Sequence, residues 1–225
     1  MNQKDRSKPE SLIKFIENAT AENFIKEYAA MINLKKRYET NIQLVFEIEE
    51  KASTEELKSH ARRLAHVYFV SILEMFLKEL IYAIYHWNIK GRDELLEKQS
   101  YNLAEAFEVF KERELVSKEI TKEYLIAHFN SFQSLQQIEF VFDRLTGKKF
   151  FNAISNYSKN TNSGNKDVDI SRTLIDFFAV RNKIVHECNI EPYSIDKMKT
   201  NAKFIYNLLI DISNYCESTD HNYKG

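Results

Sequence analysis

An arginine, an asparagine and a histidine lie close together in the last third of the chain. Arg181 and Asn182 are part of the apolar segment 174–185, and His186 follows that segment directly. An arginine keeps its charge and offers a fork of donors to a phosphate group. The imidazole of a histidine titrates near neutral pH and can transfer protons. These residue types therefore indicate chemistry on a phosphate ester.

The apolar segment predicts a buried helix, because its leucine, isoleucine, valine and phenylalanine side chains leave little room for a solvated face. Asn182 and His186 are four residues apart and share one face of such a helix. Arg181 and His186 are five residues apart, about 140° around the helix. These two side chains can meet only through the reach of the arginine or through a loosened last turn.

This pattern resembles the signature of the HEPN superfamily: an arginine, four to six residues, then a histidine, often with a polar residue directly after the arginine. Arg181, Asn182 and His186 match it with the shortest spacing. The resemblance implies an all-α helical bundle that forms a homodimer. It also implies a metal-independent endoribonuclease whose catalytic residues are these three.

RNA cleavage needs no metal ion if the adjacent 2′-hydroxyl is the nucleophile. The reaction then requires a base, an acid and positive charge for the developing phosphorane. His186 suits the proton transfers and Arg181 suits the phosphate, while Asn182 could orient His186 or bind a phosphate oxygen. One copy supplies one histidine, and the resemblance implies a two-fold dimer with both motifs facing one groove.

A glutamate in an earlier helix is a candidate supporting residue. Glu74 lies in the most apolar part of the strongest predicted helix, residues 55–89. This helix resembles the earlier core helix of several prokaryotic HEPN families, in which an acidic residue faces the arginine of the motif. A buried guanidinium needs a partner, so we predict a contact between Glu74 and Arg181. The alternative is a solvated Glu74 paired with Lys78, four residues on.

The resemblance also bears on the biological setting. Toxin partners of minimal nucleotidyltransferases carry a tyrosine two residues after the histidine, where this chain has Cys188. The chain is more similar to stand-alone prokaryotic HEPN proteins, of the RiboL-PSP-HEPN or MAE type. These are associated with toxin–antitoxin or antiviral defence, so an antitoxin or defence-system protein is an expected partner. The alternative is a non-catalytic helical module that binds a partner protein or a nucleotide.

Composition favours an all-α fold with one domain. The 225 residues include only four glycines and two prolines, and 44% of them are hydrophobic. We predict one helical domain, 1–225, with long antiparallel helices. It divides into an N-terminal helical extension (1–52), a core bundle (53–217) and a frayed tail (218–225).

Several boundaries follow from local signals. The expected features are a long helix from Thr20 to Lys51, a capping box at Ser53, helix stops at Gly91 and Gly147, and a last helix capped by Ser194. The polar segment 156–169 predicts a loop that runs into the motif helix and could line a substrate groove.

Charge and cysteine content limit the other classes of function. The net charge of −1 gives no global basic field, so RNA would be held locally or at a subunit interface. Cys188 and Cys216 are expected to be reduced thiols. His60 and His66 lack zinc spacing, so neither a metal nor a cofactor is expected. No signal peptide and no membrane helix is predicted, which favours a cytoplasmic location.

Overall fold

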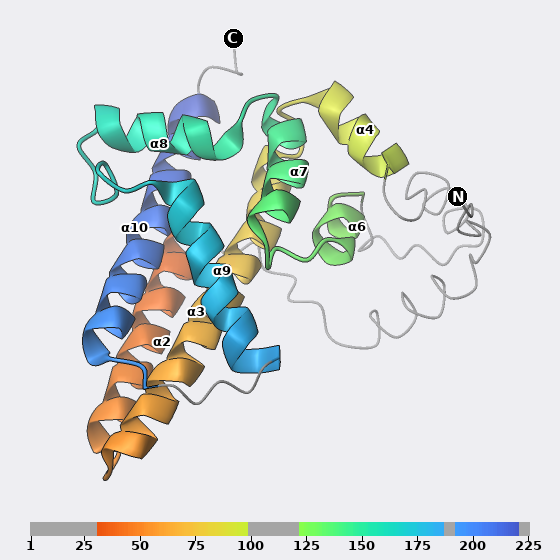
Figure 1. Cartoon of the computed structure of the whole chain (residues 1–225). Helices are drawn as coiled ribbons and strands as arrows, with labels where there is room; N and C mark the ends of the chain where they lie inside the picture. Colours follow the sequence, from red (N-terminus) through yellow and green to blue (C-terminus); the bar gives the residue numbers. More distant parts are fainter. Residues whose placement is uncertain (1–30, 99–121, 187–191, 221–225) are drawn as a thin grey trace, which may run out of the picture.

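The structure is a computed structural model that describes residues 31–98, 122–186 and 192–220. Every regular element within these ranges is an α-helix, so the predicted all-α class is confirmed (Figure 1). The helices are α2 (Met31–Lys51), α3 (Glu55–Ile84), α4 (Ile89–Lys98), α6 (Lys122–Phe129), α7 (Leu135–Thr146), α8 (Phe150–Asn160), α9 (Ile170–His186) and α10 (Ile195–Asp220).

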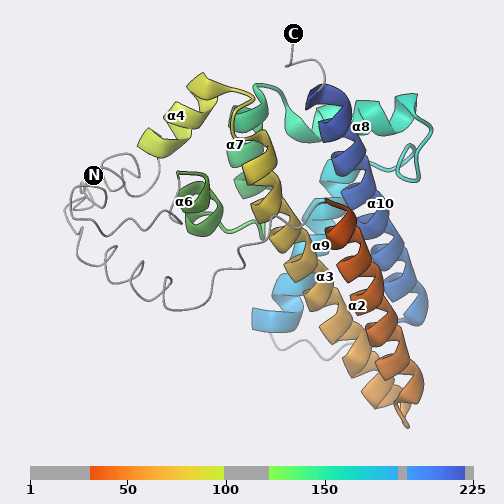
Figure 2. The ribbon, with the colours of Figure 1, turned by 180° about the vertical axis from the view of Figure 1, so that it is seen from behind.

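Helix α3 lies at the centre of the bundle. It packs against α2, α10, α9, α6 and α7, and thirteen of its thirty residues are buried (Figures 1 and 2). The hydroxyl of Thr54 accepts a hydrogen bond from the backbone N–H of Leu57 (3.2 Å), so the cap lies one residue after the predicted Ser53. Two acidic residues in the first turn, Glu55 and Glu56, add favourable charge at the positive end of the helix dipole.

Helix α2 belongs to this bundle. It packs against α3 and α10, with Ile42, Val45 and Phe46 against the core. A buried ion pair joins the two helices, because Arg62 Nε of α3 donates to Glu49 Oε1 of α2 (2.9 Å). Residues 31–51 of the predicted extension 1–52 are therefore part of the core bundle, and residues 1–30 lie outside the described part of the chain.

The predicted helix 55–89 is interrupted. Helix α3 ends at Ile84, and Asn88 begins α4: its Oδ1 accepts from Gly91 N (3.3 Å) and its Nδ2 donates to the carbonyl oxygen of Arg144 in α7 (2.7 Å). Gly91, the predicted stop, lies inside α4. A Cβ atom there would come within 2.1 Å of that Arg144 oxygen, so the glycine permits the close packing of α4 on α7.

Other boundaries differ less from the prediction. Gly147 ends α7 in the left-handed region (φ 67°), and Ser194 Oγ accepts from Lys197 N (3.2 Å) at the start of α10, so both predictions are confirmed. Helix α8 continues to Asn160, and the predicted loop therefore begins at Thr161 rather than at residue 156. Helix α10 continues to Asp220, three residues past the predicted end of the core.

None of the described helices combines the length and the apolar character that crossing a bilayer requires.

Candidate functional site: the C-terminal end of α9

The three motif residues lie on the last turns of α9, and their side chains meet. Arg181 Nη1 donates to Asn182 Oδ1 (3.1 Å) and lies 3.2 Å from His186 Nε2. Helix α9 remains helical through His186, so the arginine spans the five-residue spacing by its own length. The predicted proximity of Arg181 and His186 is confirmed. Asn182 forms its hydrogen bond with Arg181 and not with His186.

The contact between Arg181 and His186 has a defined direction. A guanidinium has five N–H donors and no acceptor. In a hydrogen bond between these two groups Arg181 therefore donates and His186 Nε2 accepts. The site thus places an imidazole nitrogen next to a fixed positive charge.

The end of α9 is exposed, which corrects the predicted burial. Ile170, Leu174, Phe177 and Phe178 are buried, but Asn182 and His186 are exposed and Val185 is 41% exposed. The first turns of α9 pack on α3, α7 and α8, and Figure 1 shows α9 diverging from α3 towards its C-terminal end. The motif therefore presents its polar groups to solvent.

The predicted pair of Glu74 and Arg181 is not formed. Glu74 Oε2 accepts from Gln133 Nε2 (2.9 Å), and Glu74 Oε1 pairs with Lys78 Nζ (3.3 Å). The pair with Lys78 is the one that the alternative named, but the Glu74 side chain is only 16% exposed rather than solvated. The main premise of the predicted pair also fails, because Arg181 is only partly buried and needs no compensating carboxylate.

The crossing of α3 and α9 explains the separation of these two residues. His66 of α3 contacts Phe177 of α9, and the helices run in opposite directions (Figure 1). From this crossing, Glu74 lies about 12 Å along α3 in one direction and Arg181 lies about 6 Å along α9 in the other. Glu74 therefore keeps no contact with the motif.

A buried histidine network joins α3, α9 and the start of α10. His66 is 0% exposed; its Nε2 lies 2.9 Å from the carbonyl oxygen of Phe177, and its Nδ1 lies 2.8 Å from the hydroxyl of Tyr193. The carbonyl can only accept, so Nε2 carries the proton and Nδ1 accepts from the tyrosine. Asn201 Nδ2 donates to the same hydroxyl (2.6 Å). The sequence alone does not show this network, because only the fold brings its members together.

The backbone of Tyr193 is fixed as well. Its N–H donates to Ser59 Oγ (2.9 Å), and its carbonyl accepts from Arg62 Nη1 (3.2 Å). Phe177 lies one turn before Arg181, and Tyr193 lies seven residues after His186. Helix α3 therefore holds the chain on both sides of the motif.

Burial makes His66 sensitive to acid. Burial is the main reason why the pKa of His66 is lowered from the ordinary value of 6.5 to about 4. The hydrogen bond to the Phe177 carbonyl opposes this change, and the charge of Lys197 contributes to it. Between pH 6.5 and about pH 4, His66 therefore binds a proton in the unfolded chain but not in the folded chain. The contribution of His66 to the free energy of unfolding is fully present above pH 6.5 and is lost as the pH falls from 6.5 to 4.

As the pH falls from 6.5 to 4, we expect protonation of this histidine to lower the free energy of unfolding by about 3 kcal/mol. The measurement is urea unfolding at a series of pH values for the wild type and for His66→Gln, in which the amide keeps a donor for Phe177 but cannot take up a proton. The variant should have the shallower pH dependence, while His60→Gln, an exposed histidine of the same helix, should match the wild type. Equal slopes in all three proteins would contradict the assignment.

The predicted substrate loop lies at the other end of α9. Residues 161–169 precede Ile170, about 20 Å from the motif along the helix. The loop packs on α10 instead: Asn165 is buried and its Nδ2 donates to the Phe204 carbonyl (3.3 Å), and Gly164 lies against the amide of Asn207. The loop therefore does not line a groove at the motif of the same chain.

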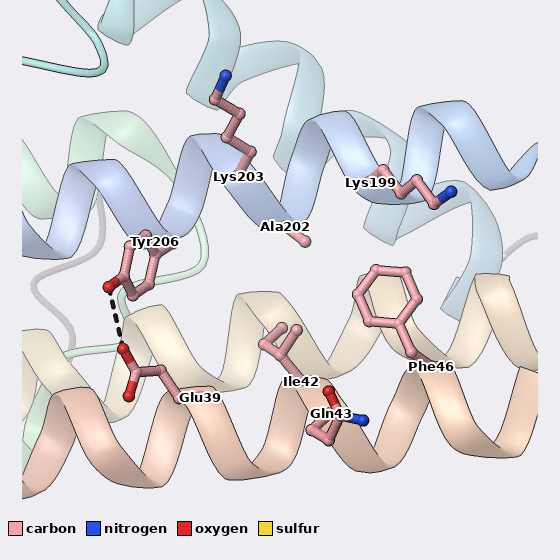
Figure 3. A pocket seen from close by; sticks show the side chains of 8 residues that line it. All are labelled: Glu39, Ile42, Gln43, Phe46, Lys199, Ala202, Lys203 and Tyr206. Atoms are coloured by element: carbon pink, nitrogen blue, oxygen red, sulfur yellow. Dashed lines mark hydrogen bonds between the residues drawn. The ribbon is translucent and has the colours of Figure 1, made fainter.

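A separate groove lies between α2 and α10 (Figure 3). It has a volume of about 490 Å³, with Ile42, Phe46 and Ala202 as its apolar lining. The Glu39–Tyr206 hydrogen bond (3.0 Å) lies at one end of the view and Phe46 at the other. No motif residue lines this groove.

No three histidine, cysteine, aspartate or glutamate side chains gather into a possible metal site within the described ranges. Comparisons with models of protein families, with curated proteins and with solved structures gave no match for this chain.

Proposed function

We propose that this protein is a metal-independent endoribonuclease of the HEPN type, with Arg181, Asn182 and His186 as its active-site residues. The observation that supports this most directly is the contact of Arg181 Nη1 with His186 Nε2 at an exposed helix end. It places an imidazole nitrogen beside a fixed cation. A reaction that removes a hydroxyl proton beside a phosphate can use this pair of groups.

The proposed reaction is an internal transfer of the phosphate. The imidazole of one His186 takes the proton of a 2′-hydroxyl, and the 2′-oxygen forms a bond to phosphorus. The bond from phosphorus to the 5′-oxygen breaks, and the protonated His186 of a second copy gives that oxygen a proton. The products are a 2′,3′-cyclic phosphate and a 5′-hydroxyl. Arg181 donates to the non-bridging oxygens, and Asn182 orients its guanidinium.

The mechanism requires two copies of the chain, since each copy supplies one motif histidine. The exposure of the motif on one protomer is consistent with a site completed by a second. Two arginines and two histidines in one groove would also create a local basic site on a chain whose net charge is −1. Toxin–antitoxin or antiviral defence, with an antitoxin or another defence protein as partner, is the setting proposed from the resemblance.

The groove between α2 and α10 is the feature behind a second candidate, a non-catalytic binding module. It is open to solvent, with Lys199 and Lys203 on its α10 side and Glu39 on its α2 side. A partner protein or a nucleotide is the ligand proposed for it. In this case the motif would serve packing between subunits and the protein would not cut RNA.

The test is incubation of purified protein with a mixed-sequence RNA in excess chelator, beside DNA of the same sequence. We expect RNA fragments and intact DNA, because only RNA carries the nucleophile. The rate should follow a bell-shaped pH dependence, since one histidine must be neutral and the other charged. Cleavage that stops in chelator and returns with magnesium would contradict the proposal and indicate another mechanism.

A further inference from the structure

Helix α3 carries a row of large apolar side chains that no described element covers. Six of the nine exposed large hydrophobic residues in the described ranges lie on α2 and α3. Four of them are on α3: Leu57 (52% exposed), Leu64 (54%), Tyr68 (37%) and Met75 (46%). Contiguous exposed apolar side chains of this size are typical of an interaction surface.

The four residues form one straight row along α3, which we call the seam. At 100° per residue, their positions around the helix axis fall within about 40° of one another. Ala61 and Ser71 fill the remaining positions, so the full series 57, 61, 64, 68, 71, 75 advances in alternating steps of four and three. This is the spacing of the seam of a coiled coil, which a second helix covers.

Two further exposed residues extend this surface onto α2. Leu44 and Ile48 are four residues apart and are 51% and 61% exposed. Leu44 lies about 160° around α2 from Phe46, which lines the groove with α10, so it faces away from α10. The seam of α3 also faces away from α10, because it is opposite His66, whose partners include Asn201. Both rows therefore lie on one side of the α2–α3 pair.

We propose that this surface is a homodimer interface in which α3 pairs antiparallel with α3 of a second copy. The intervals between Leu57, Leu64, Tyr68 and Met75 are seven, four and seven, which read the same in both directions. A two-fold axis midway between Leu64 and Tyr68 thus places each of them opposite the other from the second copy. The same axis places Leu57 opposite Met75 and, at the small positions, Ala61 opposite Ser71.

The charges beside the seam fit the same arrangement. Glu56 and Lys78 flank the seam on one side, near opposite ends. In the antiparallel pair, Glu56 of one copy lies near Lys78 of the other, because they are ten and twelve residues from the axis on opposite sides. A partner without this symmetry would not match large to large, small to small and acid to base at once, so the pattern selects a second copy of the chain.

The seam and the motif lie on different sides of α3. His66 lies opposite the seam and contacts Phe177 of α9, so the proposed interface is on the side of α3 that faces away from the motif helix. The interface therefore does not itself bring two motifs into one groove. The pairing of α3 goes beyond the proposed function, which needs a separate contact between motifs, and it can be tested without RNA cleavage.

The test is a complementation experiment followed by sedimentation at tens of micromolar. Leu64→Lys and Tyr68→Glu should each convert the dimeric wild type into a monomer. An equimolar mixture of the two variants should recover a heterodimer, because one introduced lysine then faces one introduced glutamate across the axis and the other Leu64–Tyr68 contact is intact. A parallel pairing would not place these substitutions opposite each other.

The matched control is Ile89→Lys, which replaces an equally exposed residue of α4 (59%) and should leave the dimer intact. All three positions are exposed, so circular dichroism should show melting temperatures close to that of the wild type. A monomeric wild type, a dimer that survives Leu64→Lys, or a mixture that stays monomeric would each overturn the proposal. Loss of RNA cleavage with the dimer intact would instead count against the proposed function alone.

Discussion

Replacing His186 by alanine is expected to lower the rate of RNA cleavage by at least about 100-fold, the usual effect of losing a general acid or base. In a two-fold site the variant loses both proton-transfer groups at once. His186 is exposed and its hydrogen-bond contact is with the neighbouring Arg181, so the fold should be unaffected. Single-turnover cleavage of a labelled RNA measures the rate, and a thermal melt measures the fold.

Two further variants make this result specific. Arg181→Lys keeps the charge but loses the guanidinium fork, so cleavage should be clearly impaired. His60→Ala removes an exposed histidine of α3 and should retain the wild-type rate. If His186→Ala cuts RNA as fast as the wild type, the histidine has no part in proton transfer. If it unfolds the protein, its role is structural.

Replacing Arg62 by alanine is expected to lower the free energy of unfolding by about 3–5 kcal/mol, the usual cost of breaking a buried ion pair from one side. The Arg62 and Glu49 side chains are only 8% and 12% exposed, so the carboxylate would be left almost without solvent. Arg62 also bonds Glu55 and the carbonyl of Tyr193, and it thereby joins α2, α3 and the start of α10. Urea unfolding measures the loss.

The control is the double variant Arg62→Met with Glu49→Gln, which removes both charges and should recover most of the stability. Arg172→Ala provides a second comparison, because its pair with Asp176 is 70% and 63% exposed and should contribute little. Equal losses for Arg62→Ala and Arg172→Ala would show that the Arg62 pair is not effectively buried.

The sequence predicted the parts of the fold that depend on local signals. The motif helix, the stop at Gly147 and the cap at Ser194 follow from hydrophobic spacing and cap chemistry, which act over a few residues. The contact of Arg181 with His186 was also predictable, because the reach of arginine and the helix geometry determine it.

The interruption between α3 and α4 depends on contacts that are distant in sequence. The apolar run continues through Ile84 towards Ile89, so periodicity alone favours one helix. Helix α3 nevertheless ends at Ile84, and Asn88 starts α4 by bonding both Gly91 and the Arg144 carbonyl of α7. An asparagine three residues before a helical glycine is a recognisable cap, but its second contact, fifty-six residues away, is not visible in the sequence.

The burial of polar groups was harder to predict than the helices themselves. An apolar run does not show where its helix extends past the helices that pack on it. The exposed end of α9 and the actual partners of Glu74 were therefore not predicted. The seam on α3 did have a signal, the alternating steps of four and three from Leu57 to Met75. The apolar residues on the other faces of α3 hid it, because the run looks uniformly apolar until burial separates the faces.

The most direct test of the central claim is the chemistry of the cut ends. Wild-type protein in excess chelator is given an RNA with one mapped cleavage site, and the same RNA with a 2′-methoxy group at that site. We expect the first to yield a 2′,3′-cyclic phosphate and a 5′-hydroxyl, and the second to remain uncut there, because its nucleophile is blocked. Products with 3′-hydroxyl ends, or cleavage of the methoxy substrate at the same position, would contradict attack by the 2′-hydroxyl.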